Sequence, residues 1–392
     1  MLVYVKGVQF ANKGAQLMLL AIRERLARAR PDAELVLLPG PTSPYRERAR
    51  LAAWQLLPLR RVGVDLGWLA GRAPAALRRR ARAYGIVGEA ELDAVLDASG
   101  FAYGAPWPER ALRYAAGELT RLARRGRPYL FLPQAFGEFA PGSRSTRRFA
   151  AALPRAARIY ARDARSRAHL TALGPEVAAR VRQCPDLTLA VAGDAAGARR
   201  WGVTRRTLLL VPNAEMLGPR NPDAAARGGY LPMLGHLAAV ARDAGYEVRV
   251  LNHEGERDAA LCTLLARSAG GLEIISESDA LAAKGVLGAA AAVIASRFHA
   301  CAAALSQGVP CLATGWSHKY AALYEEFGVR DWLLDAGAAA AAATTLTTLL
   351  AAPEARAAAL AARRAELVVE IEALWSDVLA LLATPPPPTT DT

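Results

Sequence analysis

One stretch in the last third of the chain combines a cation and a histidine directly after a buried strand. The strand ends at Ser296 and is followed by Arg297 and His299, while the loop after the next strand carries His318 and Lys319. The pattern predicts a helix that begins here, and helix N-termini favour anions because their N–H groups are free. A guanidinium adds a two-pronged donor for phosphate or carboxylate. We therefore expect Arg297, His299 and Lys319 to converge on one small anion, whereas the alternative makes His299 a packing residue and Lys319 a surface charge.

Lysine is scarce in this chain, whereas arginine and alanine are abundant, a balance typical of a GC-rich coding bias. Lysine persists only at Lys6, Lys13, Lys284 and Lys319. Because a planar guanidinium cannot replace a compact ammonium at every site, a retained lysine indicates a geometric need. For Lys6, chance survival is an equally good interpretation.

Short apolar strands alternate with helical patterns along most of the chain. This alternation is typical of βαβ units with a parallel sheet. Two such series within 392 residues predict two α/β, Rossmann-like domains that face each other across a cleft. Ligands of such sheets bind beyond the carboxyl ends of the strands. The predicted boundaries are 1–190 for the N-terminal domain, 191–202 for the linker, 203–382 for the C-terminal domain with its closing helices, and 383–392 for a disordered tail.

The predicted strands are short and fall into the two series. The first series lies at 2–7, 34–38, 94–98, 129–132 and 158–161, and the second at 207–211, 247–251, 273–275, 292–295 and 310–313.

Composition excludes several classes of protein. A hydrophobic content of 53% with 22% charged residues indicates a folded chain. The net charge of +13 is compatible with nucleic acid, yet the sequence has no zinc-finger spacing, RNP-like aromatic cluster or lysine run, so we expect no nucleic-acid partner. The opening residues lack the features of a signal peptide, and no apolar run approaches 20 residues. We expect a cytoplasmic protein.

The four cysteines show neither C-x-x-C pairing nor zinc-like spacing with histidine. We expect them to be buried free thiols in a reducing compartment, and we expect no metal site. They are Cys184, Cys262, Cys301 and Cys311.

Several ordered motifs over roughly residues 1–330 resemble the polysaccharide pyruvyltransferase family. Members of that family resemble GT-B glycosyltransferases in fold, so the resemblance implies a GT-B-like arrangement. It also implies a bacterial enzyme of exopolysaccharide or cell-envelope biosynthesis. The motifs are Asn12–Leu19, Asp97–Gly104, Leu132–Gly137, Ala161–Asp163 with Ser166, Cys184–Asp186, Lys284–Gly285, Ser296–His299, Gly308–Pro310 and Trp316–Tyr320.

The resemblance also implies a reaction and the residues that perform it. Family members transfer the enolpyruvyl carbons of phosphoenolpyruvate, a co-substrate, onto sugar hydroxyls as a ketal, which requires no cofactor or metal. His299 matches the family's acid/base position. The implied donor-binding residues are Arg162, Ser296, Arg297, His318 and Lys319; the implied acceptor-binding residues are Asn12, Lys13, Asp97, Ser99, Tyr103 and Gln134.

Three further polar residues fall near these motifs. His253 and Glu254 end a strand of the second series, where donor-site support and a capping role are equally good interpretations. Lys284 lies in one of the motifs and is expected to support the site.

Two other functions remain open. One is a GT-B glycosyltransferase with a nucleotide-sugar donor, although no acidic pair is placed to hold a ribose. The other is a sugar-phosphate binding protein without catalysis, against which the complete set Arg297, His299 and Lys319 argues.

An arginine-rich insertion is predicted at 45–85, with Trp54, Trp68 and Arg78–Arg80. Aromatic and aliphatic side chains beside arginine suit the interface of an anionic bilayer. The first interpretation is therefore peripheral contact with the inner face of a membrane that carries a lipid-linked saccharide acceptor. The second, which we prefer on the sequence alone, is a packed helical pair with ordinary arginine-rich solvent faces.

Overall fold

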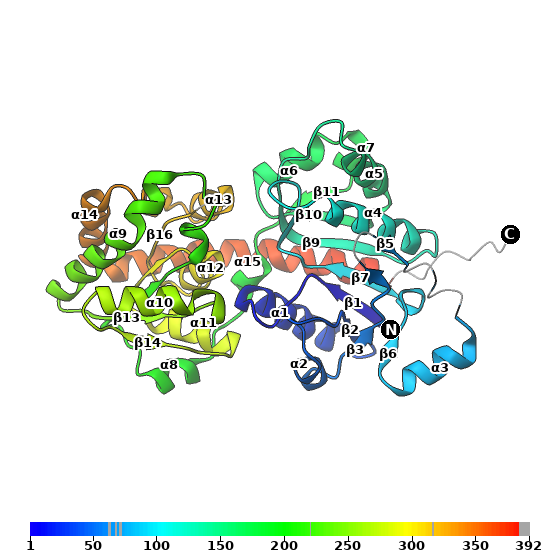
Figure 1. Cartoon of the computed structure of the whole chain (residues 1–392), viewed down its shortest axis with the longest axis horizontal. Coiled ribbons are helices and arrows are strands. Elements are labelled where there is room, and N and C mark those ends of the chain that lie inside the picture. Colours follow the sequence, from blue (N-terminus) through cyan, green and yellow to red (C-terminus); the bar gives the residue numbers. More distant parts are fainter. Residues whose placement is uncertain (62–63, 67–68, 70–72, 220, 316, 384–392) are drawn as a thin grey trace. The chain divides into compact units, whose positions relative to one another are not determined.

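The computed structural model describes residues 1–61, 64–66, 69, 73–219, 221–315 and 317–383 (Figure 1). Trp68, Trp316 and the predicted tail from residue 384 onward lie outside the described residues. Contacts between Cα atoms divide the chain into two compact units. Unit 1 comprises Met1–Phe10, Met18–Leu187 and the segment from Glu370 onward, and unit 2 comprises Ala11–Leu17 and Thr188–Val369.

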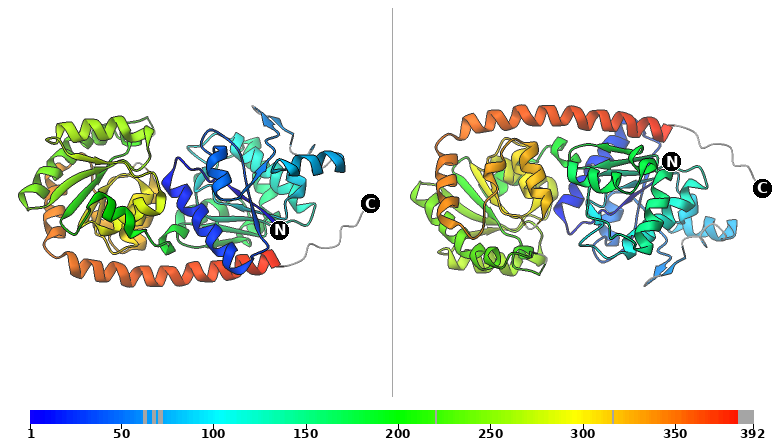
Figure 2. Two further views of the ribbon diagram at one scale, coloured as in Figure 1. Left: turned by 90° about the horizontal axis from the view of Figure 1, so that it is seen from below. Right: turned by 90° about the horizontal axis from the view of Figure 1, so that it is seen from above.

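Two helices contribute residues to both units. Helix α1 (Lys13–Ala29) begins among the residues of unit 2 and continues in unit 1. Helix α15 (Pro353–Ala383) is a single unbroken helix in both views of Figure 2, and its last residues, from Glu370, belong to unit 1. The first and last parts of the sequence are therefore shared between the units.

Unit 1 is built on a nine-stranded sheet within the described residues. The strand order is β11-β10-β9-β7-β1-β2-β3-β6, with β8 beside β9, and every pair is parallel. All five strands predicted for the first half are confirmed. The bounds are β1 Leu2–Lys6, β2 Glu34–Leu37, β3 Trp54–Leu56, β6 Ile86–Val87, β7 Ala94–Asp97, β8 Phe101–Tyr103, β9 Tyr129–Phe136, β10 Arg158–Ala161 and β11 Val181–Gln183.

The segment 45–85 departs from the expected insertion, because part of it belongs to the sheet. Strand β3 pairs with β2, and Trp54 in β3 is half-buried and donates its indole N–H to Glu34. The segment also holds α2 (Tyr45–Arg50), the hairpin of β4 (Arg60–Arg61) and β5 (Val64–Asp65), and α3 (Ala75–Ala83). Strands of two or three residues are too short to show a periodic pattern, which explains why β3 and β6 escape prediction.

Aromatic side chains fill the core of unit 1 under the sheet. Tyr103 stacks on Phe149 with ring centroids 5.4 Å apart, and Phe131 meets Phe149 edge to face at 6.2 Å. Such pairs add to the free energy that burial supplies. The helices of this unit after β7 are α4 (Arg110–Ala123), α5 (Arg144–Ala152), α6 (Ala164–Thr171) and α7 (Pro175–Ala178).

Unit 2 contains a five-stranded parallel sheet in the order β14-β13-β12-β15-β16. All five residues of the central strand, β12 (Thr207–Val211), are buried, as expected when helices cover both faces of a parallel sheet. The five predicted strands of the second half are confirmed. Their bounds are β12 Thr207–Val211, β13 Glu247–Leu251, β14 Glu273–Ile275, β15 Ala292–Ala295 and β16 Cys311–Ala313.

Helices connect the strands of unit 2. The expected linker 191–202 contains α8 (Ala195–Trp201), which packs against α11 instead of forming a free connection. All four cysteines are buried free thiols, as predicted. Among the described helices, none combines the length and the apolar composition that a membrane span requires. The other helices are α9 (Ala224–Asp243), α10 (Glu256–Ser268), α11 (Ala280–Ala289), α12 (Phe298–Leu305), α13 (His318–Glu326) and α14 (Ala339–Leu350).

Candidate functional site

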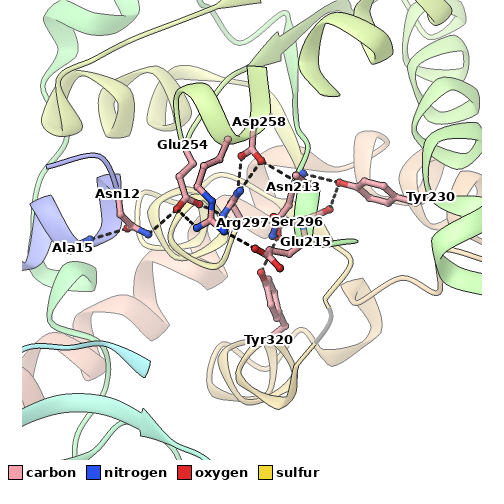
Figure 3. Close-up of polar contacts among 12 residues, drawn as sticks. Asn12, Ala15, Asn213, Glu215, Tyr230, Glu254, Asp258, Ser296, Arg297 and Tyr320 are labelled. Atoms are coloured by element: carbon pink, nitrogen blue, oxygen red, sulfur yellow. Dashed lines mark hydrogen bonds and ion pairs between the residues drawn. The ribbon is translucent and has the colours of Figure 1, made fainter. Parts of the chain in front are cut away.

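Polar side chains gather at the carboxyl edge of the sheet of unit 2. Three neighbouring parallel strands, β13, β12 and β15, end at this edge, and each is followed by polar residues. Figure 3 shows the side chains that these three segments bring together. Their convergence follows from the topology, because the carboxyl ends of adjacent parallel strands meet at one edge.

Arg297 is the centre of this group. It occupies the N-cap position of α12 and is held by two carboxylates from the segment after β13 (Figure 3). Its Nε and Nη2 atoms lie 2.7 and 2.6 Å from the two oxygens of Asp258, and Nη1 pairs with Glu254. The guanidinium predicted to meet a small anion therefore has its donors directed at carboxylate oxygens. An incoming phosphate or carboxylate at Arg297 would have to displace at least one of them.

Asp258 was not predicted from the sequence. Its side chain is fully buried, and besides binding Arg297 it accepts a hydrogen bond from the backbone N–H of Ala214 at 3.0 Å. It joins the segment after β12 to Arg297. An acidic residue in the first turn of a helix is usually read as support for the helix dipole. Two acidic residues four positions apart, Glu254 and Asp258, follow the end of β13 directly. This pattern is the sequence signal that could have identified Asp258 as a site residue.

Ser296 lies behind Arg297 and organises the backbone there. Its Oγ accepts from the Tyr230 hydroxyl at 2.7 Å and lies 2.7 Å from Oγ1 of Thr314. Its carbonyl accepts from Asn213 Nδ2 at 2.6 Å and from the Tyr320 hydroxyl at 2.8 Å. With 1% of its surface exposed, Ser296 is placed as a positioning residue for Arg297. Direct contact with a donor remains a prediction.

The start of α1 lies with these unit 2 residues. Asn12 caps the helix, since its Oδ1 accepts from the Ala15 N–H at 3.0 Å, and its Nδ2 donates to Glu254 at 3.2 Å (Figure 3). Lys13 is 7% exposed, and burial lowers its pKa while the carboxylates of Asp279 and Glu277 act in the opposite direction. Both residues were predicted to bind the acceptor, yet the structure groups them with the predicted donor residues.

Gly14 in the first turn of α1 lies close to the catalytic candidate His299. A Cβ atom on Gly14 would lie 1.9 Å from His299 Nδ1 and 2.1 Å from its Cγ. The imidazole also meets the Phe298 ring edge to face at 5.2 Å. The absence of a side chain at Gly14 therefore allows the first turn of α1 to lie directly on the His299 ring.

His253, which follows β13, is 5% exposed. Burial lowers its pKa well below the ordinary 6.5, and the positive charges of Arg297, His299 and Lys13 lower it further. His253 is therefore neutral at pH 7.

The pKa of His253 predicts that the protein loses stability in mild acid. Unfolded His253 binds a proton as the pH falls through 6.5, whereas the folded residue does not, so the free energy of unfolding falls by up to about 1.4 kcal/mol per pH unit. We expect the thermal midpoint of His253→Gln to depend less on pH between 7 and 5.5 than that of the unaltered protein. His236→Gln, at an exposed position in α9, should keep the full dependence. Equal pH dependence in both variants would contradict the assignment.

The other predicted cations of unit 2 have different surroundings. Lys319, in the first turn of α13, has its Nζ atom 5.4 Å from the ring centroid of Phe298 and 5.5 Å from that of Tyr320. His318 begins the same helix and is partly exposed. Lys284 is buried, and its ammonium donates hydrogen bonds to the Thr188 carbonyl at 2.6 Å and to the Ser306 hydroxyl at 3.1 Å. These contacts give Lys284 a structural role inside unit 2.

Three of the predicted acceptor residues form a buried network in unit 1. The carboxylate of Asp97, fully buried at the end of β7, accepts from Ser99 Oγ and the Tyr103 hydroxyl at 2.6 Å each and from the Tyr129 hydroxyl at 2.8 Å. Lys6 Nζ lies 3.4 Å from the same carboxylate. Lys6 was an undecided residue in the sequence, and the structure gives its ammonium a specific place.

Gln134 and Arg162 are neighbours in unit 1. Gln134 Nε2 donates to the Asp97 carbonyl at 3.1 Å, and the Gln134 carbonyl accepts from the backbone N–H of Arg162. The Arg162 guanidinium pairs with Asp186 at 2.7 Å and is 6% exposed. Among the described residues, the buried Oε1 atom of Gln134 has no hydrogen-bond partner.

A pocket of about 260 Å³ opens at the carboxyl ends of β1, β2 and β7. Lys6, Gly7, Leu38, Thr42 and Ser99 are among its lining residues. Gly7 has a φ of +82°, and a Cβ there would lie 2.3 Å from Ser99, so only glycine permits this approach. Strands β2, β3 and β6 lie on one side of β1, whereas β7 and the later strands lie on the other side. The strand order therefore reverses between β1 and β7, and ligands of such folds bind at this switch point.

No group of three or more His, Cys, Asp or Glu side chains suited to a metal ion occurs in the part of the chain that the structure describes. The polar clusters of units 1 and 2 are instead built from ion pairs and hydroxyl groups.

Known structures identify the class of fold. The chain is similar to a putative UDP-N-acetylglucosamine 2-epimerase from Listeria monocytogenes (TM-score 0.59, 10% identity, 96% of both chains covered). It is also similar to Anabaena Alr3699/HepE in complex with UDP and glucose (TM-score 0.54, 12% identity, 97% of this chain and 99% of that chain). A third similar structure is the UDP-GlcNAc 2-epimerase from Neisseria meningitidis (TM-score 0.54, 10% identity, 95% and 100% covered). The protein has the GT-B fold, and at these identities the similarity establishes the fold alone.

The family follows from the sequence itself. The family model for polysaccharide pyruvyl transferase matches residues 12–318, and the chain belongs to that family. The match begins at Asn12 and includes both Arg297 and His299. None of the curated proteins matches the chain significantly.

Proposed function

We propose that the protein transfers the pyruvyl group of phosphoenolpyruvate to two hydroxyls of a saccharide, forming a ketal and releasing phosphate. Family membership supports a pyruvyl transferase. The observation that carries the proposal is the group of basic residues at the carboxyl edge of the sheet of unit 2. Arg297 and His299 lie at the start of α12, and Lys13 begins the turn of α1 that lies against the His299 ring. Once the donor displaces Glu254 from Arg297, these basic side chains suit a small molecule that carries both a phosphate and a carboxylate.

The atoms, bonds and protons of the proposed reaction balance without any further reactant. The enol methylene carbon takes up one proton and becomes a methyl group, which leaves an oxocarbenium-like centre at the adjacent carbon. A sugar hydroxyl adds to that carbon, the bond from carbon to the phosphate oxygen breaks, and a second hydroxyl closes the ring. The two hydroxyls lose two protons. One ends on the methyl group and the other on the departing hydrogen phosphate.

His299 is proposed as the group that protonates the methylene carbon and accepts a hydroxyl proton. Arg297 and Lys319 are proposed to bind the donor anion in unit 2, whereas Arg162, which the family resemblance also implies, pairs with Asp186 inside unit 1. Since Glu254 and Asp258 already bind Arg297, the donor is expected to displace Glu254, which has Asn12 and Arg257 as alternative partners.

The saccharide acceptor is proposed to bind in the pocket of unit 1 at the ends of β1, β2 and β7. Its lining includes the hydroxyls of Thr42 and Ser99, which are suitable partners for sugar hydroxyls. The ammonium of Lys6 also lines the pocket, where it is held by Glu118 and Tyr129. Asp97 holds Ser99 from behind through a 2.6 Å hydrogen bond. In this proposal Asp97 and Tyr103 are positioning residues, and Ser99 touches the sugar.

The contact between Gly14 and His299 predicts a strong effect of a single methyl group. Gly14→Ala places a Cβ 1.9 Å from His299 Nδ1, so the imidazole or the first turn of α1 must move. A displacement of about 1 Å in a catalytic group costs roughly 10²-fold in rate, and we expect such a loss of turnover. Gly235→Ala in α9, where a Cβ meets nothing within 4 Å, is the matched control and should retain full turnover. Full turnover in Gly14→Ala would show that the close contact does not matter.

The second candidate is a GT-B glycosyltransferase with a nucleotide-sugar donor. The observation in its favour is the similarity in fold to Anabaena Alr3699/HepE, whose structure contains UDP and glucose. A sugar-phosphate binding protein without catalysis would share the same basic cluster.

Thermal shift with candidate donors distinguishes these functions. A ligand at about 100-fold its Kd raises the free energy of unfolding by roughly 2.7 kcal/mol. We expect phosphoenolpyruvate to raise the melting temperature and UDP-sugars to leave it unchanged. Stabilisation by a UDP-sugar alone would favour the glycosyltransferase. Stabilisation by phosphoenolpyruvate without phosphate release in the presence of any saccharide would favour the binding protein.

A further inference from the structure

We propose that an exposed basic and apolar surface of unit 1 docks onto an anionic lipid bilayer. The surface, here called the α3 surface, is formed by helix α3 and the exposed apolar side chains around it in sequence. The docking itself is independent of the proposed reaction. Its purpose, to bring a lipid-borne saccharide to the pocket of unit 1, rests on the proposed function. The α3 surface comprises Leu57, Leu66, Leu69, Leu77, Arg78, Arg79, Arg80, Arg82 and Tyr84.

Exposed apolar side chains are concentrated in one short part of the chain. Among the described residues, ten large hydrophobic side chains are exposed, and seven of these lie between residues 38 and 84. The most exposed in the α3 surface are Tyr84 at 74% and Leu77 at 57%. Single exposed apolar residues are ordinary, but clusters mark contact surfaces.

Helix α3 has no side chain buried against the rest of unit 1. Of its nine residues four are arginines and none is acidic. Within unit 1, α3 projects outward in both views of Figure 2. A helix this short is normally stabilised by packing of an apolar face, which α3 lacks in the isolated chain. A bilayer would provide that packing if Leu77 enters the apolar boundary of the membrane and the arginines of α3 bind the lipid phosphates.

The combination of side chains identifies the partner as a lipid surface. Leucine and tyrosine side chains enter the boundary between headgroups and acyl chains, while arginines bind the lipid phosphates. A nucleic acid would use the arginines but leave Leu57, Leu77 and Tyr84 exposed. Trp54, expected from the sequence to contribute, is held in the sheet by β3 and by its hydrogen bond to Glu34. Leucine and tyrosine therefore form the apolar part of the α3 surface.

Two further exposed apolar residues belong to the proposed acceptor pocket or follow it closely in sequence. Leu38 lines the pocket and is 37% exposed, and Tyr45, 76% exposed, begins α2 shortly after the pocket residues Thr42 and Ser43. An acceptor carried on a membrane lipid would thus meet apolar side chains at the pocket and farther along the same segment.

Vesicle co-sedimentation tests the proposal with matched variants. The protein is mixed with vesicles of phosphatidylcholine, alone or with phosphatidylglycerol, at low and high salt. We expect binding only to the anionic vesicles, reduced by salt. Arg78→Gln, Arg79→Gln and Arg80→Gln together should weaken binding about 100-fold, as expected for three arginines near such a surface. The control combines Arg144→Gln, Arg148→Gln and Arg165→Gln in α5 and α6, which removes three exposed charges from unit 1 elsewhere and should leave binding nearly unchanged.

A second variant tests the apolar contribution without changing charge. Leu77→Ser with Tyr84→Ser should weaken binding at least 10-fold. All variants should retain the melting temperature and the rate of phosphate release with a water-soluble acceptor, because none of these side chains is buried. Equal loss in the two triple arginine variants, or no binding to anionic vesicles, would overturn the proposal. So would binding to duplex DNA that depends on Arg78–Arg80 while vesicle binding does not. Absence of phosphate release with normal vesicle binding would instead contradict only the proposed reaction.

Discussion

Replacing His299 with alanine should lower the rate of phosphate release about 10²–10⁴-fold while the Kd of phosphoenolpyruvate changes little. The reason is that His299 is proposed to transfer protons, a contribution of this size, whereas Arg297 and its neighbours bind the donor. His299 lies at the start of α12 against the first turn of α1, so its ring is held in place on two sides.

Single-turnover kinetics separates this effect from binding. Donor affinity is measured by titration calorimetry on the same preparations, and His236→Ala, at an exposed position in α9, serves as the control. A His299→Ala enzyme with near-normal turnover would remove His299 from the mechanism. A variant that loses donor affinity in proportion to rate would instead make it a binding residue.

Arg297 and Glu254 should respond in opposite directions to substitution. Arg297→Ala removes a charge-assisted contact and should weaken phosphoenolpyruvate binding by about 1.5–3 kcal/mol. It also leaves the carboxylates of Glu254 and Asp258 without their shared cation, so we expect a loss of stability of about 3–5 kcal/mol. Glu254→Gln keeps the shape but removes the charge that competes with the donor, so the Kd should fall.

Titration calorimetry with phosphoenolpyruvate and with inorganic phosphate measures both effects. Arg330→Ala, at an exposed arginine paired with Glu325, is the control for a general change in charge. Tighter binding in Glu254→Gln together with weaker binding in Arg297→Ala supports displacement of Glu254 by the donor. Unchanged affinity in Glu254→Gln would mean that the donor does not compete with this carboxylate.

The ends of the buried strands could be predicted from the sequence, and with them the main part of the unit 2 site. Apolar runs such as 207–211 and 292–295 are read directly, and the residues that follow them must meet at one edge of the sheet. The partners of Arg297 could not be read in this way. Asp258 resembles an ordinary acidic residue at a helix start, and its role depends on where α10 lies in space.

The beginning of α1 shows the same limit. A turn with Asn12, Lys13 and Gly14 after the first strand indicates a helix start, and Asn12 does cap that helix. The sequence does not reveal that these residues contact Glu254 and His299, which lie more than 200 positions away. Similarly, β3 and β6 are added to the sheet by pairing with neighbours and not by a pattern of their own.

The central claim is transfer of pyruvyl from phosphoenolpyruvate, and phosphate release across a panel of saccharides tests it most directly. The panel contains lipid-linked and nucleotide-linked sugars, and each reaction is analysed by mass spectrometry for the mass of the acceptor plus pyruvyl. We predict that at least one saccharide triggers phosphate release in equal amount to a ketal product, and that His299→Ala lowers the rate of both about 10²–10⁴-fold. Glycosyl transfer from a UDP-sugar by the same protein, with phosphoenolpyruvate left intact by every saccharide, would contradict the account.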